Sequence, residues 1–129
     1  DVYALGVLLY ELLAGQRPWR TEGLPVARLV QAIVHEEPAP ASRVATASSP
    51  VAARQIAGDL DAIIATCLRK NAADRYPTVE ALQRDIERHL ANEPVAARGR
   101  ARLETIFPSA STMRTSASPI HSPRQPGRG

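Results

Sequence analysis

A continuous apolar segment near the start of the chain constrains the fold more than any other feature of the sequence. From residue 2 to residue 14 almost every side chain is apolar or small, and Glu11 is the single charged one. Gly15 can adopt the left-handed conformation that ends a helix, and Pro18 prevents continuation. A helix that is apolar on every side must be surrounded by protein. The segment is shorter than the roughly 20 residues that span a bilayer, so we expect a buried helix and no membrane segment.

Three further helices are predicted downstream. Apolar residues recur at helical spacing over 25–37, over 60–70 and over 79–91, with Asp59 and Thr78 as N-caps of the last two helices. Residues 38–58 are rich in Ala, Ser and Pro and predict a long irregular connection. Because no strand pattern and no repeat is visible, the expected fold class is all-α with about four helices. The predicted apolar stripes are Val26, Leu29, Val30, Ile33 and Val34; Leu60, Ile63, Ile64, Cys67 and Leu68; and Val79, Leu82, Ile86 and Leu90.

Composition divides the chain into two parts. Residues 1–95 carry ten Lys or Arg against twelve Asp or Glu, a net charge of −2, whereas 96–129 carry six Arg against Glu104 alone, a net charge of +5. The second part is rich in Ser, Pro and Arg, which predicts a disordered tail. Six scattered arginines with one aromatic residue, Phe107, are a weak nucleic-acid footprint. We therefore expect no nucleic-acid partner.

The cysteine and the histidines indicate neither a disulfide nor a metal site. Cys67 is the only cysteine, and its place on an apolar stripe favours a buried core residue over a redox role. The histidines, His35, His89 and His121, fall in different segments without ligand spacing. No signal peptide is visible, so a cytoplasmic location in a reducing compartment is expected.

Three stretches within residues 1–95 share their order and spacing with a known family. They are Asp1-Val2-Tyr3-Ala4-Leu5-Gly6 with Arg17-Pro18-Trp19, Asp59-Leu60-Asp61-Ala62-Ile63-Ile64 with Cys67-Leu68-Arg69-Lys70, and Asp74-Arg75-Tyr76-Pro77-Thr78. These stretches resemble the C-terminal lobe of bacterial eukaryotic-type serine/threonine protein kinases. The resemblance implies that 1–95 is a partial protein kinase domain containing the last four helices of the large lobe, and that 96–129 is a tail outside it. It also implies that the intact parent transfers the γ-phosphate of ATP, with Mg²⁺, to Ser or Thr of proteins.

The resemblance assigns roles to three residues. Asp1 matches the acid that holds the catalytic loop, although a plain helix N-cap explains it as well. Arg75 matches the arginine that pairs with the glutamate ending the activation segment, and the alternative is an ordinary turn arginine. Glu11 lies where some kinases receive an arginine of the substrate, and a carboxylate at an exposed edge is the simpler explanation.

The catalytic motifs of the family are not found in these 129 residues. They contain no G-x-G-x-x-G loop, no His-Arg-Asp and no Asp-Phe-Gly, and the only lysine, Lys70, ends a predicted helix. We therefore expect no catalytic, ATP-binding or metal-binding residue here, and a chain that is inactive by itself. Its expected partners are protein substrates or upstream kinase segments.

Without those upstream segments, an apolar face of the first helix should be uncovered. We expect this face to include some of Val2, Leu5, Leu9 and Leu12. Two alternatives stay open: a freestanding helical module that docks partners through the second helix and the 38–58 loop, and a regulator that binds nucleic acid through its tail. The sequence also leaves open a shifted reading frame after Arg98.

Overall fold

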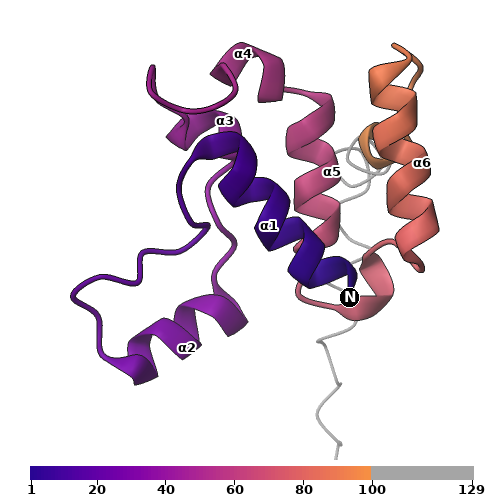
Figure 1. Cartoon of the computed structure of the whole chain (residues 1–129). Coiled ribbons are helices and arrows are strands. Elements are labelled where there is room, and N and C mark those ends of the chain that lie inside the picture. The colour runs from indigo at the N-terminus through magenta and orange to yellow at the C-terminus, as the bar shows by residue number, and fades with distance from the viewer. Residues whose placement is uncertain (100–129) are drawn as a thin grey trace, which may run out of the picture.

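The computed structural model describes residues 1–99, and all regular structure in this range is helical. This confirms the predicted all-α class with four long helices. Helices α1, α5 and α6 lie side by side, α3 and α4 cover one end of α1 and α5, and α2 stands apart (Figure 1). None of the described helices is long and apolar enough to cross a membrane. The bounds are α1 Val2–Ala14, α2 Val26–His35, α3 Ala41–Val44, α4 Ala53–Ile56, α5 Asp59–Cys67, the 3₁₀ turn η1 Ala72–Asp74 and α6 Val79–Leu90.

Helix α1 begins and ends as its sequence predicts. The Asp1 carboxylate accepts a hydrogen bond from the backbone N–H of Tyr3 at 2.9 Å, and Gly15 has the left-handed φ of 74°. The expected uncovered apolar face is present, because Leu12 and its neighbour Leu8 are 57% and 49% exposed. The other apolar residues named for this face, Val2, Leu5 and Leu9, are half-buried.

The buried side of α1 consists of Gly6, Tyr10 and Ala14, which are four residues apart and therefore lie on one face. Gly6 is the point of closest approach to α5. A Cβ atom at this position would collide with the Cβ of Cys67 and would lie 3.2 Å from Cδ2 of Leu68. Glycine is therefore needed here because only its missing side chain lets the two backbones approach this closely.

The core consists of two clusters that meet along α5. One lies toward α1, α3 and α4, and the other lies toward α6 and the residues after it. The stripe predicted for the third helix is confirmed, since Leu60 is half-buried and the other members are buried. The buried members of the first cluster are Tyr10, Ala14, Ala41, Ile56, Ile64 and Leu68; those of the second are Ile63, Cys67, Tyr76, Leu82, Val95 and Ala97.

The connection over 38–58 is more ordered than its composition predicts. It contains α3 and α4, and it places Ala41 and Ile56 in the core. The hydroxyl of Tyr10 donates to the backbone carbonyl of Ala39 at 2.7 Å. Asp61 of α5 accepts hydrogen bonds from the backbone N–H and the side chain of Ser42. The prediction of an irregular loop was wrong because each helix is a single turn, too short to show a periodic pattern.

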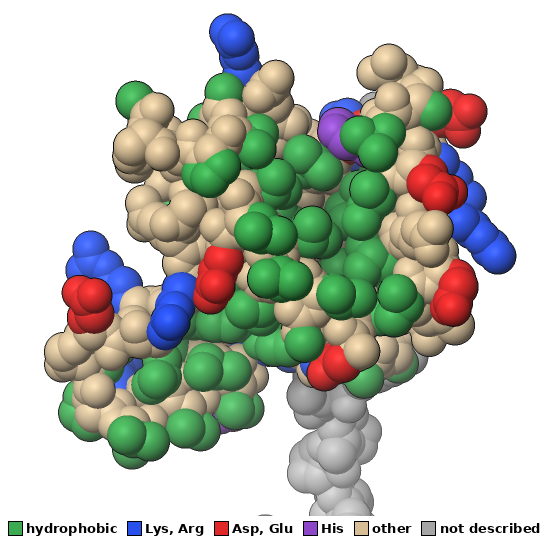
Figure 2. All heavy atoms as spheres, in the orientation of Figure 1, with side chains coloured by type: hydrophobic (Ala, Val, Ile, Leu, Met, Phe, Trp, Pro, Cys, Tyr) green, Lys and Arg blue, Asp and Glu red, His purple; other side chains and the backbone are tan. Residues whose placement is uncertain are grey.

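Helix α2 buries much less than its apolar stripe predicts. Only Ala32 is buried, Leu29 and Ile33 are half-buried, and Val26, Val30 and Val34 are exposed. The space-filling view shows these side chains as part of an apolar surface along the outer side of α2 (Figure 2). The periodicity correctly identified a helix with one apolar face, but no other element of the described chain covers that face.

The apolar stripe predicted for α6 was partly wrong, and so was the N-cap predicted for α5. Leu82 is buried and Ile86 half-buried, but Val79 and Leu90, at the two ends of α6, are exposed. Thr78 caps α6 as predicted, accepting from the N–H of Ala81 at 3.1 Å. Asp59, in contrast, is not the N-cap of α5, because the cap position is Gly58.

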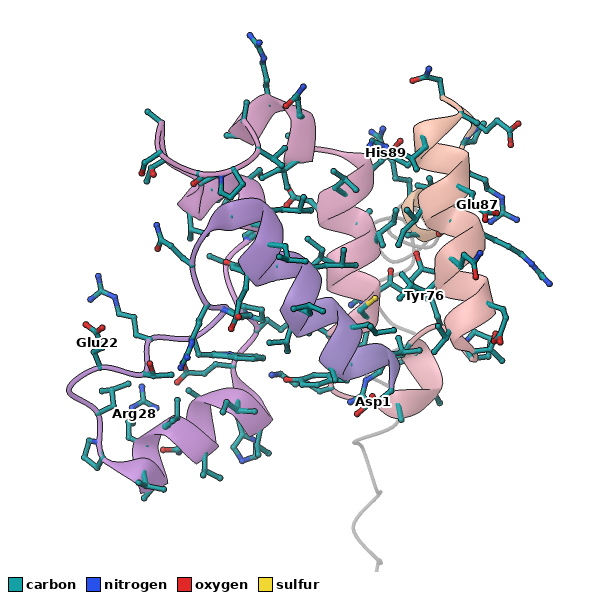
Figure 3. The ribbon with its side chains drawn as sticks, in the orientation of Figure 1. Asp1, Glu22, Arg28, Tyr76, Glu87 and His89 are labelled. Atoms are coloured by element: carbon teal, nitrogen blue, oxygen red, sulfur yellow. The ribbon has the colours of Figure 1, made fainter. Side chains whose placement is uncertain are left out.

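The Asp59 carboxylate instead contacts groups that follow much later in the chain. It lies 3.0 Å from Nδ1 of His89 and 3.2 Å from Nη1 of Arg98. His89 points from α6 toward α5, whereas Glu87 points away from it (Figure 3). These two partners explain why the cap prediction failed, since they compete with the helix terminus for the same carboxylate.

The packed part of the chain continues past α6. Val95 and Ala97 are buried in the second core cluster. Residues 100–129, which contain most of the predicted disordered tail together with Glu104, Phe107 and His121, lie outside the described residues.

Candidate functional site

Three parts of the chain meet at the N-terminal end of α1. They are the first turn of α1, the loop after α1 and the turn between α5 and α6. Figure 3 shows Asp1 where α1 approaches the turn before α6. Two of the three residues named from the sequence, Asp1 and Arg75, belong to this end of the molecule.

Tyr3 connects Asp1 and Arg75. Its backbone N–H is the group capped by Asp1, and the guanidinium carbon of Arg75 lies 4.8 Å from the centre of its ring. A cation at this distance from an aromatic face is attracted by the ring quadrupole. Partial burial raises the pKa of Tyr3, and the positive charge of Arg75 opposes this rise.

Arg75 is held by the backbone of its own turn. Its Nε donates to the carbonyl of Arg69 at 2.7 Å, and its Nη2 donates to the carbonyl of Lys70 at 3.2 Å. These bonds close the turn after α5 and aim the guanidinium at the start of α1. The pairing of Arg75 with an activation-segment glutamate stays a prediction, as does the contact of Asp1 with a catalytic loop.

Trp19 extends this arrangement toward α2. Its ring stacks on Tyr3 with centroids 6.3 Å apart, and the Lys70 ammonium lies 5.0 Å from the Trp19 ring centre. Lys70 also donates to the carbonyl of Ile33 at 2.6 Å, and Trp19 Nε1 donates to the carbonyl of Glu36 at 3.4 Å. Burial lowers the pKa of Lys70. Both side chains therefore attach the C-terminal end of α2 to the core.

Sequence reasoning did not anticipate this stack of aromatic rings and cations. Tyr3, Trp19, Lys70 and Arg75 were each present in the stretches that resemble kinases, but periodicity does not show that they touch. One general rule could have suggested these contacts: cationic and aromatic side chains often pair once the elements that carry them are adjacent.

Glu11 lies further along α1 and outside this cluster. Its carboxylate is 40% exposed and lies 3.6 Å from Nε of Arg17. A guanidinium can therefore reach this carboxylate from the loop that follows α1. The substrate-docking role of Glu11 stays a prediction, and an arginine of another protein would have to displace Arg17.

An apolar groove runs between α1 and α6. It encloses about 380 Å³ and is visible as a hollow band of apolar side chains between α1, α5 and α6 (Figure 2). We call this feature the interhelical groove. Its lining residues are Leu9, Leu13, Val51, Gln55, Leu60, Ile63, Ile64, Ile86, His89 and Leu90.

Among the described residues, Lys70 and Cys67 are both engaged in packing. Within residues 1–99 no group of three or more His, Cys, Asp or Glu side chains is arranged to hold a metal ion. Lys70, the one lysine, is engaged by a backbone carbonyl and the Trp19 ring. Burial raises the pKa of the Cys67 thiol to about 12, so this side chain is an unreactive core group.

Comparison with known proteins finds serine/threonine-protein kinases among the relatives of this chain. No family model matches the chain. The chain is 39% identical over 104 residues to a probable serine/threonine-protein kinase of Corynebacterium efficiens, which is 81% of this chain and 15% of that protein. It is 35% identical over 105 residues to the probable serine/threonine-protein kinase PknB of Corynebacterium glutamicum, with the same coverage. It is 37% identical over 98 residues to the serine/threonine-protein kinase PknB of Mycobacterium tuberculosis, covering 75% of this chain and 14% of that protein. The chain thus spans about 15% of the length of these relatives.

Proposed function

We propose that this chain, which belongs to the bacterial serine/threonine protein kinases, corresponds to the C-terminal part of their catalytic domain and supports phosphoryl transfer without performing it. In this proposal the parent kinase transfers phosphate from ATP to Ser or Thr of protein substrates. Residues 1–95 supply the helical base of the large lobe. The observation that carries the proposal is the joint placement of the kinase-like stretches at one end of α1, where Tyr3 links Asp1 to Arg75.

The proposed contribution of this end of α1 is to position other segments. An acid at a helix N-terminus is suited to accept hydrogen bonds from backbone N–H groups, because a carboxylate retains free lone pairs after capping one N–H. The Asp1 carboxylate is exposed and can accept further hydrogen bonds. Arg75, fixed by two carbonyls, offers its remaining N–H groups to a carboxylate. Both side chains would therefore orient the catalytic machinery rather than react.

The interhelical groove is the proposed contact for the upstream part of the catalytic domain. Leu90 at its edge is 75% exposed, and an apolar surface of this kind marks a protein contact. A segment of the same kinase domain is the occupant that the family relationship favours. The cytoplasmic location expected from the sequence would be that of the catalytic domain, and it too is part of the proposal.

The purified 129-residue chain is expected neither to bind ATP nor to transfer phosphate. Phosphoryl transfer depends on positioned metal ions, a nucleotide lysine and a catalytic base, and the sequence contains none of the motifs that supply them. A titration with a fluorescent ATP analogue and Mg²⁺, followed by a radiolabelled phosphotransfer assay on a generic protein substrate, checks this expectation. Circular dichroism must first show that the chain is helical. Saturable, Mg²⁺-dependent binding or labelled substrate would refute it.

The exposed groove is expected to bind the dye ANS. Leu90→Lys should reduce the fluorescence increase by more than about half, because a charge at the groove edge opposes burial of the dye. Val26→Lys, on the exposed face of α2, is the matched control. It changes an equally exposed apolar residue away from the groove. If Val26→Lys lowers the signal and Leu90→Lys does not, the accessible apolar surface is that of α2 and the proposed contact is wrong.

A second candidate function is favoured by the exposed apolar face of α2. Leu24, Val26, Val30 and Val34 are all more than 40% exposed. In this alternative the chain is a freestanding module, and an apolar segment of a partner protein packs along α2. The genomic sequence before the codon of Asp1 separates the two. In-frame His-Arg-Asp and Asp-Phe-Gly codons support the kinase domain, whereas a start codon immediately before Asp1 supports the module.

A further inference from the structure

Asp85 is the only buried acidic side chain among residues 1–99, and it is fully buried. It lies on the inner side of α6, one turn after Leu82, which belongs to the second core cluster. Burying an ionised carboxylate costs several kcal/mol unless hydrogen bonds replace its hydration. The partners of Asp85 must therefore explain why an acid lies here instead of another apolar residue.

Four described groups donate hydrogen bonds to this carboxylate. Oδ1 accepts from Nη1 of Arg88 at 2.7 Å and from the backbone N–H of Ala96 at 2.8 Å. Oδ2 accepts from the hydroxyl of Tyr76 at 2.6 Å and from the backbone N–H of Ala97 at 3.0 Å. Each oxygen thus receives two donors. An amide or a protonated carboxyl group would direct its own donor at one of these pairs, so only an ionised carboxylate satisfies the site.

Two of these donors belong to the segment that follows α6. Residues 96–99 are helical, and the carboxylate caps the first N–H groups of this turn from a different helix. The neighbouring side chains Val95 and Ala97 are 4% and 1% exposed. Arg98 adds a contact with Asp59 at the start of α5. The segment therefore lies between α5 and α6, and Figure 1 shows it behind these helices.

We propose that Asp85 clamps residues 95–98 to the helical core, so that this segment is held at a fixed position between α5 and α6. The clamp recognises backbone N–H groups and two small apolar side chains, so it fixes position without requiring a particular polar sequence. The segment would then keep a fixed orientation relative to α6 instead of moving freely from the end of that helix at Leu90. This inference does not depend on the proposed kinase function.

Hydrogen exchange resolved at single amides of the full chain tests the clamp. In the wild-type protein the amides of Ala96 and Ala97 are expected to be protected, because both are engaged by a buried carboxylate. Asp85→Asn is expected to raise their exchange rates by at least about tenfold more than those of the Ile64 and Cys67 amides in α5, which lose only the protection that follows from the lower global stability. Arg98→Ala is the matched control. It removes the contact with Asp59 but not the clamp, and it should change these rates by less than about threefold.

Two results would overturn the proposal. One is rapid, unprotected exchange of Ala96 and Ala97 in the wild-type chain. The other is unchanged exchange in a folded Asp85→Asn variant. If the Asp85→Asn variant loses hydrogen-exchange protection at every amide, the Ala96→Pro variant is measured instead. This substitution removes one hydrogen-bond donor to the Asp85 carboxylate. Residue 96 is exposed and lies in the first turn of a helix, where proline is tolerated. Faster exchange of Ala97 in Ala96→Pro supports the clamp, and an unchanged rate contradicts it.

Discussion

Replacing Gly6 with alanine is expected to lower the free energy of unfolding by about 1–3 kcal/mol, the usual cost of overpacking a filled core. The added Cβ would collide with the Cβ of Cys67, an atom of α5 that cannot rotate away. Alanine normally stabilises a helix by up to about 1 kcal/mol relative to glycine, so the observed loss would be net of this gain. Urea or thermal denaturation followed by circular dichroism measures the difference.

Gly99→Ala is the matched control for this measurement. Among residues 1–99, no atom lies within 4 Å of the position where its Cβ would be added. The same substitution should therefore change the free energy of unfolding by less than about 0.5 kcal/mol. Equal or greater stability of Gly6→Ala would show that α1 and α5 can separate without cost, and the close crossing at Gly6 would be wrong.

The stability of the chain is expected to fall in acid as Asp85 takes up a proton. Burial alone would raise the pKa of Asp85, but the hydrogen bonds from Tyr76, Ala96, Arg88 and Ala97 outweigh burial and lower the pKa. The folded state therefore keeps this carboxyl ionised where the unfolded chain, with an Asp pKa of about 3.9, already binds a proton. The stabilisation is complete above about pH 5 and is lost as the pH falls below about 4 through the folded-state pKa.

Asp85→Asn isolates this contribution. At neutral pH the variant should lose about 3–5 kcal/mol, as when one partner of a buried charged network is removed. A loss of this size is a large part of the roughly 5–15 kcal/mol that stabilises a small domain. The difference between wild type and variant should shrink as the pH falls further below about 4 and the wild-type carboxyl is also neutralised. Denaturant midpoints between neutral and acidic pH measure this change.

Glu87→Gln is the control for the acid series. Glu87 lies on the outer face of α6, and its carboxylate accepts from Gln83 in solvent. This variant should stay within about 0.5 kcal/mol of the wild type at every pH. If Asp85→Asn is no less stable than Glu87→Gln at neutral pH, the buried carboxylate does not stabilise the fold as its geometry implies.

Local signals in the sequence predicted the long helices well. The apolar run over residues 2–14, the left-handed Gly15 and the Thr78 cap depend on neighbours a few residues away, and the structure has each of them. What local pattern could not show is which apolar face has a neighbour. Val26 and Leu90 lie on predicted stripes yet are exposed, because no other described element packs on them.

The periodicity of apolar residues could not predict polar contacts between residues far apart in the chain. Asp59 was expected to cap α5, but its partners, His89 and Arg98, are 30 and 39 residues away. Asp85 offered a weak signal, since an acid three residues after Leu82 falls on the inner side of an amphipathic helix. For the candidate site, the family resemblance named Asp1 and Arg75, whereas their connection through Tyr3 required the three-dimensional arrangement.

Helix α2 is attached only loosely to the rest of the described residues. Two hydrogen bonds near its C-terminal end join it to the core, one from Trp19 and one from Lys70, and both use backbone carbonyls as acceptors. Side chains on the outward face, such as Val26 and Val30, contribute little to the packed interior. Substitutions there can accumulate with almost no loss of stability. Related chains could therefore diverge in what α2 contacts while the crossing of α1 and α5 stays unchanged.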